Sequence, residues 1–160
     1  MKFIMMTFLV SLSFLVACNF GEDQATSDST EAIQVEILIP GSIPLAKSTD
    51  LSVAITQGAK TVKNADEVIF ELWKENDQDN SERIEGKHEK DGLYNIEKNF
   101  EEEGIYYVQT HVTAKGMHVM PKLPFIVGTA SPEEIVKLES EKQKLGQSGP
   151  DQNTSHEHHQ

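Results

Sequence analysis

Two histidines and two methionines in one short stretch are the side chains of this sequence best suited to chemistry. His111 is followed by Met117, His118 and Met120. Imidazole nitrogen and thioether sulfur form a soft ligand set that suits copper, above all Cu(I). These four residues are therefore candidate metal ligands. The alternative is that they are ordinary polar and semi-polar residues on a solvated strand face.

A β-hairpin over residues 104–128 is predicted to hold these side chains, with its turn at residues 115–116 (Lys-Gly). The glycine supplies the positive φ angle that a tight turn requires. A two-residue loop places His111 opposite Met120, with Cβ atoms about 5 Å apart, and His118 one step along the same face. The opposite face is predicted to be core: Tyr106, Val108, Thr110, Val112, Ala114, Met117, Val119, Leu123, Phe125 and Val127.

Other candidate ligands rank below these. Met117 points to the core side in this register, at the tip of the hairpin. His88 lies on a predicted edge strand and completes the site only if that strand lies beside the hairpin. A second cluster, His156, His158 and His159, predicts either loose metal binding or a plain polar tail.

The first 17 residues have the pattern of a bacterial lipoprotein signal peptide. Lys2 precedes an apolar run over residues 3–16, which ends in Leu-Val-Ala before Cys18. A run of this length is short for a membrane span. Leu-Val-Ala-Cys resembles the lipobox, so Cys18 is predicted to carry diacylglyceryl and palmitate groups that anchor the protein to the extracytoplasmic face of the cell membrane. The alternative is an uncleaved anchor helix.

Composition excludes several functions. Cys18 is the only cysteine, so its lipidation leaves no disulfide, thiol nucleophile or thiolate metal site. The formal net charge of −12 argues against binding nucleic acid or anionic headgroups. No phosphate-binding glycine loop, zinc-protease helix motif or nucleophile elbow occurs in the chain. The protein is therefore predicted not to be an enzyme.

Alternating apolar residues separated by turn signals predict an all-β fold over residues 33–128. About seven strands are expected in an immunoglobulin-like β-sandwich. The expected organisation is a lipidated flexible tether at 18–32, the sandwich at 33–128, a short helix at 129–145 and a disordered tail at 146–160. The predicted strands cover residues 33–39, 51–57, 67–74, 83–89 and 93–100 and the two arms of the hairpin.

Two features favour the immunoglobulin-like version of the sandwich. Residues 102–108 have the spacing of a tyrosine corner around Tyr106, although a plain core tyrosine would give the same fold. Trp73 falls on the third strand, where such folds bury a large aromatic residue. Val108 occupies the position at which antibody domains place a cysteine, so packing alone holds this sandwich together.

The C-terminal helix is predicted from its start signal. Ser131 is followed by Pro132 and, three positions after the serine, by Glu134, which is a capping box with proline at the first helical position. Glu133 is expected to pair with Lys137 one turn on. The stripe predicted to dock on the sandwich consists of Ile135, Leu138 and Leu145.

The chain resembles the YtkA-like domain family, which is related to the FixH-like proteins. The resemblance rests on HVTAKGMHVMPKLPFIVG at residues 111–128, with support from DEVIFELWK at 66–74 and EEEGIYYVQ at 101–109. It implies a small β-sandwich outside the bacterial membrane, commonly with a lipoprotein signal. FixH-like relatives are associated with the assembly of copper-containing respiratory oxidases, but they carry a transmembrane anchor where this chain has a lipobox.

Two functions are expected from these observations. The first is a lipid-anchored, non-catalytic accessory protein that handles copper outside the cell, with a membrane protein such as a respiratory complex as its partner. The alternative is a metal-independent structural or interaction lipoprotein that contacts a membrane protein complex.

Overall fold

The computed structural model describes residues 31–147. Cys18, most of the predicted tether and the tail histidines lie outside the described residues. The strands are β1 (Ile33–Leu38), β2 (Ser48–Gln57), β3 (Lys60–Thr61), β4 (Glu67–Lys74), β5 (Glu82–Glu85), β6 (Lys87–Lys90), β7 (Leu93–Asn99), β8 (Gly104–Ala114), β9 (Met117–Val119) and β10 (Lys122–Val127). A 3-10 turn spans Gln78–Asn80, and the helix α1 spans Pro132–Gln147.

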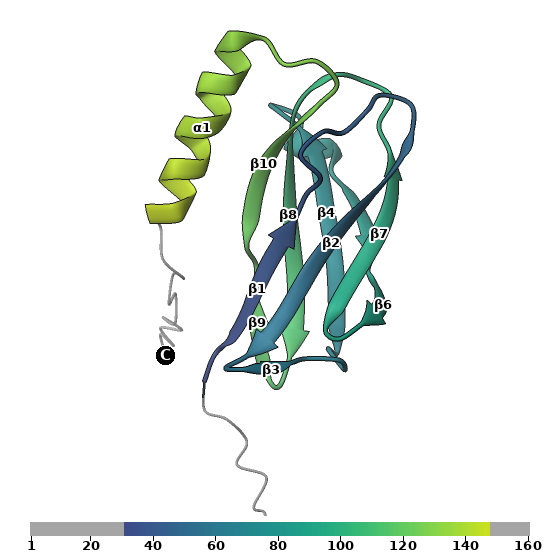
Figure 1. The fold of residues 1–160 in the computed structure, drawn as a ribbon, viewed down its shortest axis with the longest axis vertical. Coiled ribbons are helices and arrows are strands. Elements are labelled where there is room, and N and C mark those ends of the chain that lie inside the picture. The colour runs from purple at the N-terminus through teal and green to yellow at the C-terminus, as the bar shows by residue number, and fades with distance from the viewer. Residues whose placement is uncertain (1–30, 148–160) are drawn as a thin grey trace, which may run out of the picture.

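The strands form two antiparallel sheets packed face to face (Figure 1). The first sheet has the order β1-β2-β7-β6, and β3 pairs with β2. The second sheet has the order β10-β8-β4-β5, and β9 pairs with β8. This arrangement confirms the predicted all-β sandwich.

One hydrophobic core fills the space between the sheets. The buried hydrophobic residues of the described chain run from Ile33 to Leu138. Alternation along each strand sends every second side chain inward. Side chains with no exposed surface include those of Leu51, Val53, Ile55, Phe70, Val108, Val112 and Val127.

The predicted strand at residues 83–89 is divided between the two sheets. Its first half, β5, pairs with β4, whereas its second half, β6, pairs with β7. The chain crosses at Gly86, where an added Cβ would lie 2.9 Å from the Phe70 ring. A side chain at this position would displace the core, so glycine makes the crossing possible.

The two immunoglobulin-like features have different outcomes. The Tyr106 hydroxyl donates a hydrogen bond to the Glu102 carbonyl oxygen over 3.1 Å, which is the contact of a tyrosine corner. Trp73 is buried but lies outside the core between the sheets. Its ring stacks on Tyr107 on the outer face of the second sheet, with ring centroids 5.7 Å apart.

Helix α1 begins as predicted and lies alongside β10 (Figure 1). The Ser131 amide donates to the Glu134 carboxylate over 2.8 Å, and the Glu134 amide donates to Ser131 Oγ over 3.2 Å. Lys137 pairs with Glu75 of the sandwich at 2.7 Å rather than with Glu133. Of the predicted apolar stripe only Leu138 is buried, while Ile135 is 48% exposed and Leu145 is partly exposed. In the described residues, no helix is long and apolar enough to cross a membrane.

Replacing Thr110 with valine is expected to raise the free energy of unfolding by about 1–2 kcal/mol. Thr110 Oγ1 is fully buried and has no hydrogen-bond partner among the described residues, whereas valine has the same shape and no polar atom. Urea denaturation measures the change. The control is Thr49→Val, because Thr49 Oγ1 donates to the Lys47 carbonyl and its loss should bring no gain. A less stable Thr110→Val variant would contradict the prediction.

Candidate functional site

The hairpin that carries the candidate ligands has the predicted register. β9 pairs with β8 so that Thr113 faces His118, and the turn residues Lys115 and Gly116 have φ angles of 54° and 73°. Two successive positive φ angles define a type I′ turn, whose twist suits a two-residue hairpin loop. The local sequence therefore sets the register, and the register decides which side chains share a face.

The same register continues past an interruption at residues 120–121. Lys122 of β10 faces Gln109 of β8, which is the pairing that the hairpin turn dictates. Between the two ladders, the Thr110 amide donates to the Pro121 carbonyl over 3.0 Å. His111 and Met120 therefore occupy opposed positions, as predicted, although Met120 lies outside the regular strands.

The predicted ligands divide between the two faces of the sheet. The imidazole centroids of His111 and His118 are 6.2 Å apart on the outer face, and Met120 is 48% exposed. Met117 packs against the core on the other face. His88 lies on β6 in the first sheet, where its ring contacts Tyr94. Its strand therefore does not lie beside the hairpin, and His88 does not join the other candidate ligands.

The structure adds Glu71 of β4 to this group. Its carboxylate accepts hydrogen bonds from His111 Nε2 at 2.6 Å, Ser81 Oγ at 2.8 Å and Arg83 at 3.0 Å. Glu71 is 8% exposed, so its charge is held by these three donors rather than by water. The sequence does contain a signal for it, because a glutamate within an otherwise apolar strand needs a partner.

The pKa of Glu71 reflects two opposing effects. Burial raises the pKa, but the hydrogen bonds from Ser81, His111 and Arg83 together outweigh burial and hold it below the ordinary value. The carboxylate is therefore ionised at neutral pH. In this state it accepts the Nε2 proton of His111 and fixes both the tautomer and the orientation of the ring.

Each histidine uses one ring nitrogen for a hydrogen bond. His111 uses Nε2 with Glu71, and His118 uses Nδ1 with the Thr113 hydroxyl at 2.9 Å. Nδ1 of His111 and Nε2 of His118 have no hydrogen bond within the described part of the chain. Metal-binding histidines commonly donate their other ring N–H to a carboxylate, as His111 does here.

The outer face offers two imidazoles and one thioether as candidate ligands, with the Glu71 carboxylate hydrogen-bonded to His111. Across residues 31–147, no group of three or more His, Cys, Asp or Glu side chains is placed to hold a metal ion. Imidazole nitrogen and thioether sulfur are the donor types that suit Cu(I), so His111, His118 and Met120 remain the candidate ligands on this face.

Comparisons with known proteins identify the family. The family described as YtkA-like matches residues 28–111 of the chain. The soluble domain of PmoD from Methylocystis sp. ATCC 49242 (Rockwell) is a similar solved structure, with a TM-score of 0.42 and 18% sequence identity. That similarity covers 62% of this chain and 93% of the PmoD domain. No curated protein matches the sequence. The family match stops at His111, so His118 and Met120 lie beyond it.

Proposed function

The chain belongs to the YtkA-like family, and we propose that it is a membrane-anchored, extracytoplasmic accessory protein that binds Cu(I) on the outer face of its second sheet. It does so without catalysing a reaction. The lipobox supports the anchor, which attaches the chain through Cys18. The copper ligands are His111, His118 and Met120.

The observation that carries this proposal is the support of His111 by the buried carboxylate of Glu71. A 2.6 Å hydrogen bond holds Nε2, and the second imidazole is 6.2 Å away between ring centroids. A preorganised imidazole loses little freedom when it binds a metal. His118 is oriented in the same way, through its hydrogen bond to Thr113.

The exposure of Met120 suits a protein that passes copper on. Its side chain is 48% exposed, so an incoming ligand of a partner can replace the thioether without opening the core. The proposed partner is a membrane protein that contains copper, such as a respiratory complex. The lipid anchor keeps the binding site within reach of such a partner at the same membrane.

Anaerobic titration with Cu(I) against a chromophoric chelator tests the proposal. Residues 19–147 are used, because this span keeps every described element and omits the tail histidines. The double variant His118→Ala with Met120→Leu is expected to bind Cu(I) at least about tenfold more weakly, since it loses two of three ligands. Both side chains are exposed, so the fold should be kept.

Two single variants serve as controls. Met117→Leu changes the core-facing methionine, and His88→Ala changes the histidine of the other sheet. Both should bind Cu(I) like the unchanged protein. Equal Cu(I) affinity in the double variant and the unchanged protein would remove the proposal. A partner that co-purifies from solubilised membranes with chelator present would then favour the metal-independent interaction lipoprotein.

A further inference from the structure

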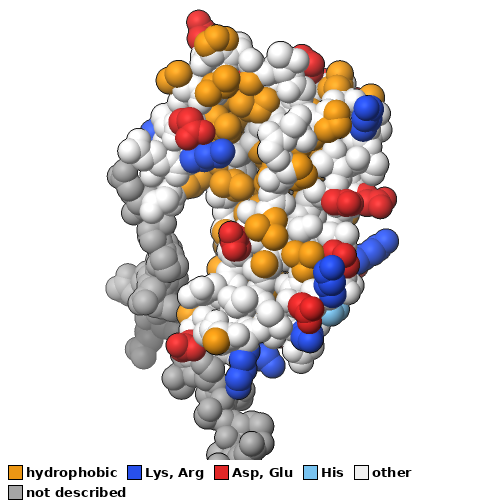
Figure 2. All heavy atoms as spheres, viewed as in Figure 1, with side chains coloured by type: hydrophobic (Ala, Val, Ile, Leu, Met, Phe, Trp, Pro, Cys, Tyr) orange, Lys and Arg blue, Asp and Glu red, His pale blue; other side chains and the backbone are white. Residues whose placement is uncertain are grey.

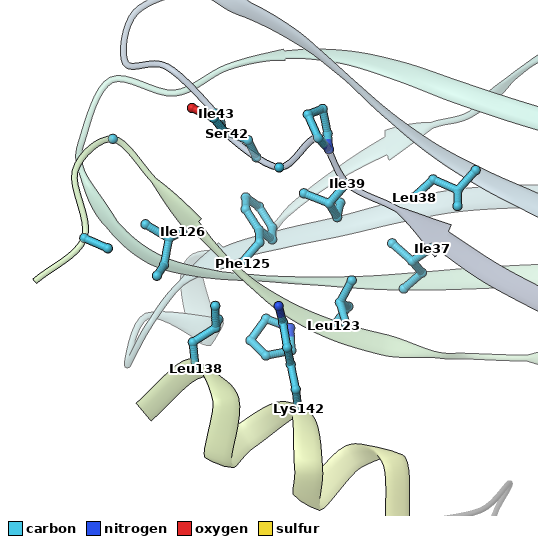
Figure 3. Close-up of a pocket in the computed structure, with 15 residues that line it drawn as sticks. Ile37, Leu38, Ile39, Ser42, Ile43, Leu123, Phe125, Ile126, Leu138 and Lys142 are labelled. Atoms are coloured by element: carbon cyan, nitrogen blue, oxygen red, sulfur yellow. The ribbon is translucent and has the colours of Figure 1, made fainter. Parts of the chain in front are cut away.

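A cleft of about 620 Å³ opens along one side of the sandwich, and none of the proposed copper ligands lines it. It lies between the C-terminal end of β1 and most of β10, the edge strands of the two sheets, and α1 forms its outer wall (Figure 3). The Gly128 amide donates to the Ile43 carbonyl over 2.9 Å and closes one end. Sites for small molecules commonly have volumes of roughly 300–1,000 Å³, so this cleft has the size of a binding site.

Most of the side chains that line the cleft are apolar, although polar atoms form part of its surface. Aliphatic side chains come from all three elements, and Figure 2 shows hydrophobic side chains gathered on this side of the molecule. Leu38 lies at the rim and is 39% exposed. The main lining side chains are Ile37, Ile39, Leu123, Phe125, Ile126 and Leu138.

Lys142 is the one charged residue among those that line the cleft. It extends from α1 towards the strands (Figure 3). Its ammonium group is 3.9 Å from the Glu139 carboxylate, at the outer limit of an ion pair. An apolar slot with a single cation complements a ligand that has an apolar chain and a single negative charge.

We propose that the cleft binds a free fatty acid, with the acyl chain between β1, β10 and α1 and the carboxylate on Lys142. A peptide strand fits this place less well. Pro124 lies in the middle of β10 and has no N–H to donate, which disfavours addition of a strand to that edge. The proposal is independent of copper binding, because the cleft and the proposed copper ligands share no residue.

Calorimetric titration of residues 19–160 with dodecanoate, dodecanol and dodecylamine tests this proposal. Lys142→Gln is expected to weaken dodecanoate binding about tenfold, because a charge-assisted hydrogen bond is lost, and to leave dodecanol binding unchanged. Leu38→Glu, which places a charge at the exposed rim, should abolish binding of both. Lys144→Gln on the same helix and Val136→Glu, at a position that is 70% exposed, are matched controls that should bind normally.

Four results would overturn the proposal. The first two are that dodecanoate does not bind, or that dodecylamine binds as tightly as dodecanoate. The other two are that the protein binds only to phosphatidylglycerol vesicles, or that it forms a concentration-dependent dimer which Leu38→Glu dissociates. The last two would assign the cleft to a membrane lipid or to a second copy of the chain. Loss of dodecanoate binding in Leu38→Glu, with Cu(I) affinity unchanged, would support the fatty-acid site separately from the copper site.

Discussion

Replacing Glu71 with alanine is expected to lower the free energy of unfolding by about 2–4 kcal/mol. The carboxylate accepts three hydrogen bonds while only 8% of the residue is exposed. Its removal leaves His111 and Ser81 without that partner and opens a gap in the face of β4. Equilibrium urea denaturation, followed by the fluorescence of Trp73, measures the loss.

Two further variants divide this loss into its parts. Glu71→Gln keeps the shape of the side chain and removes its charge, so it should lower the free energy of unfolding by less than Glu71→Ala does. Arg83→Ala removes only the most exposed donor, whose side chain is 60% exposed, and should cost under about 1 kcal/mol. A Glu71→Ala protein as stable as the unchanged one would contradict the role assigned to this carboxylate.

Substitutions of Glu71 should also weaken Cu(I) binding, even though Glu71 is not a proposed ligand. A residue that orients a metal-binding histidine typically changes metal affinity by roughly 10–100-fold when it is removed. Glu71→Gln is therefore expected to bind Cu(I) about tenfold more weakly while the sandwich stays folded. Circular dichroism of the same samples shows whether the variant is still folded, which separates weaker metal binding from unfolding.

The contribution of Glu71 to stability should depend on pH in one direction. Its folded pKa is lowered, because the hydrogen bonds from Ser81, His111 and Arg83 outweigh the effect of burial. A group with a lower pKa in the folded state binds fewer protons there, so it stabilises the fold above its unfolded pKa. The stability difference between the unchanged protein and Glu71→Gln should therefore narrow as the pH falls below about 4.

The hairpin was predictable because residues close together in the sequence determine its register. A turn at Lys115-Gly116 and alternation in both arms define one register, and the structure keeps that register from Thr113 and His118 to Gln109 and Lys122. A slip by one residue would send every core side chain outward, so competing registers are strongly disfavoured. The faces of His111, His118 and Met120 follow from this alone.

Contacts between distant segments were not predictable in the same way. Glu71 and His111 are 40 positions apart, and no spacing rule shows that β4 lies beside β8. The crossing at Gly86 likewise depends on where the Phe70 ring packs. Trp73 was expected to be a buried aromatic residue, and it is buried, but against Tyr107 on the outer face of the sheet, because it alternates with the inward-facing Leu72. No sequence pattern shows that Tyr107 is the residue that covers it.

Replacing Gly92 with alanine is expected to lower the free energy of unfolding by about 3 kcal/mol. Gly92 has a φ angle of +77°, which disfavours any side chain. An added Cβ would also lie 2.7 Å from the backbone carbonyl oxygen of Ile55, and this oxygen accepts a hydrogen bond from the Val62 amide. The clash is with backbone near the C-terminal end of β2, which cannot move aside as a flexible side chain would.

Gly116→Ala is the matched control for Gly92→Ala. Gly116 also occupies the second position of a hairpin turn and has a φ angle of +73°, but nothing lies within 4 Å of an added Cβ. Gly116→Ala should lower the free energy of unfolding by only about 1 kcal/mol, which is the cost of placing a side chain on a residue with a positive φ angle. The difference of about 2 kcal/mol between the two variants therefore measures the close approach of β2 to the turn before β7. Equal losses in urea denaturation would mean that β2 yields at Ile55, and the sandwich would then be less tightly packed at this end than its fully buried core residues imply.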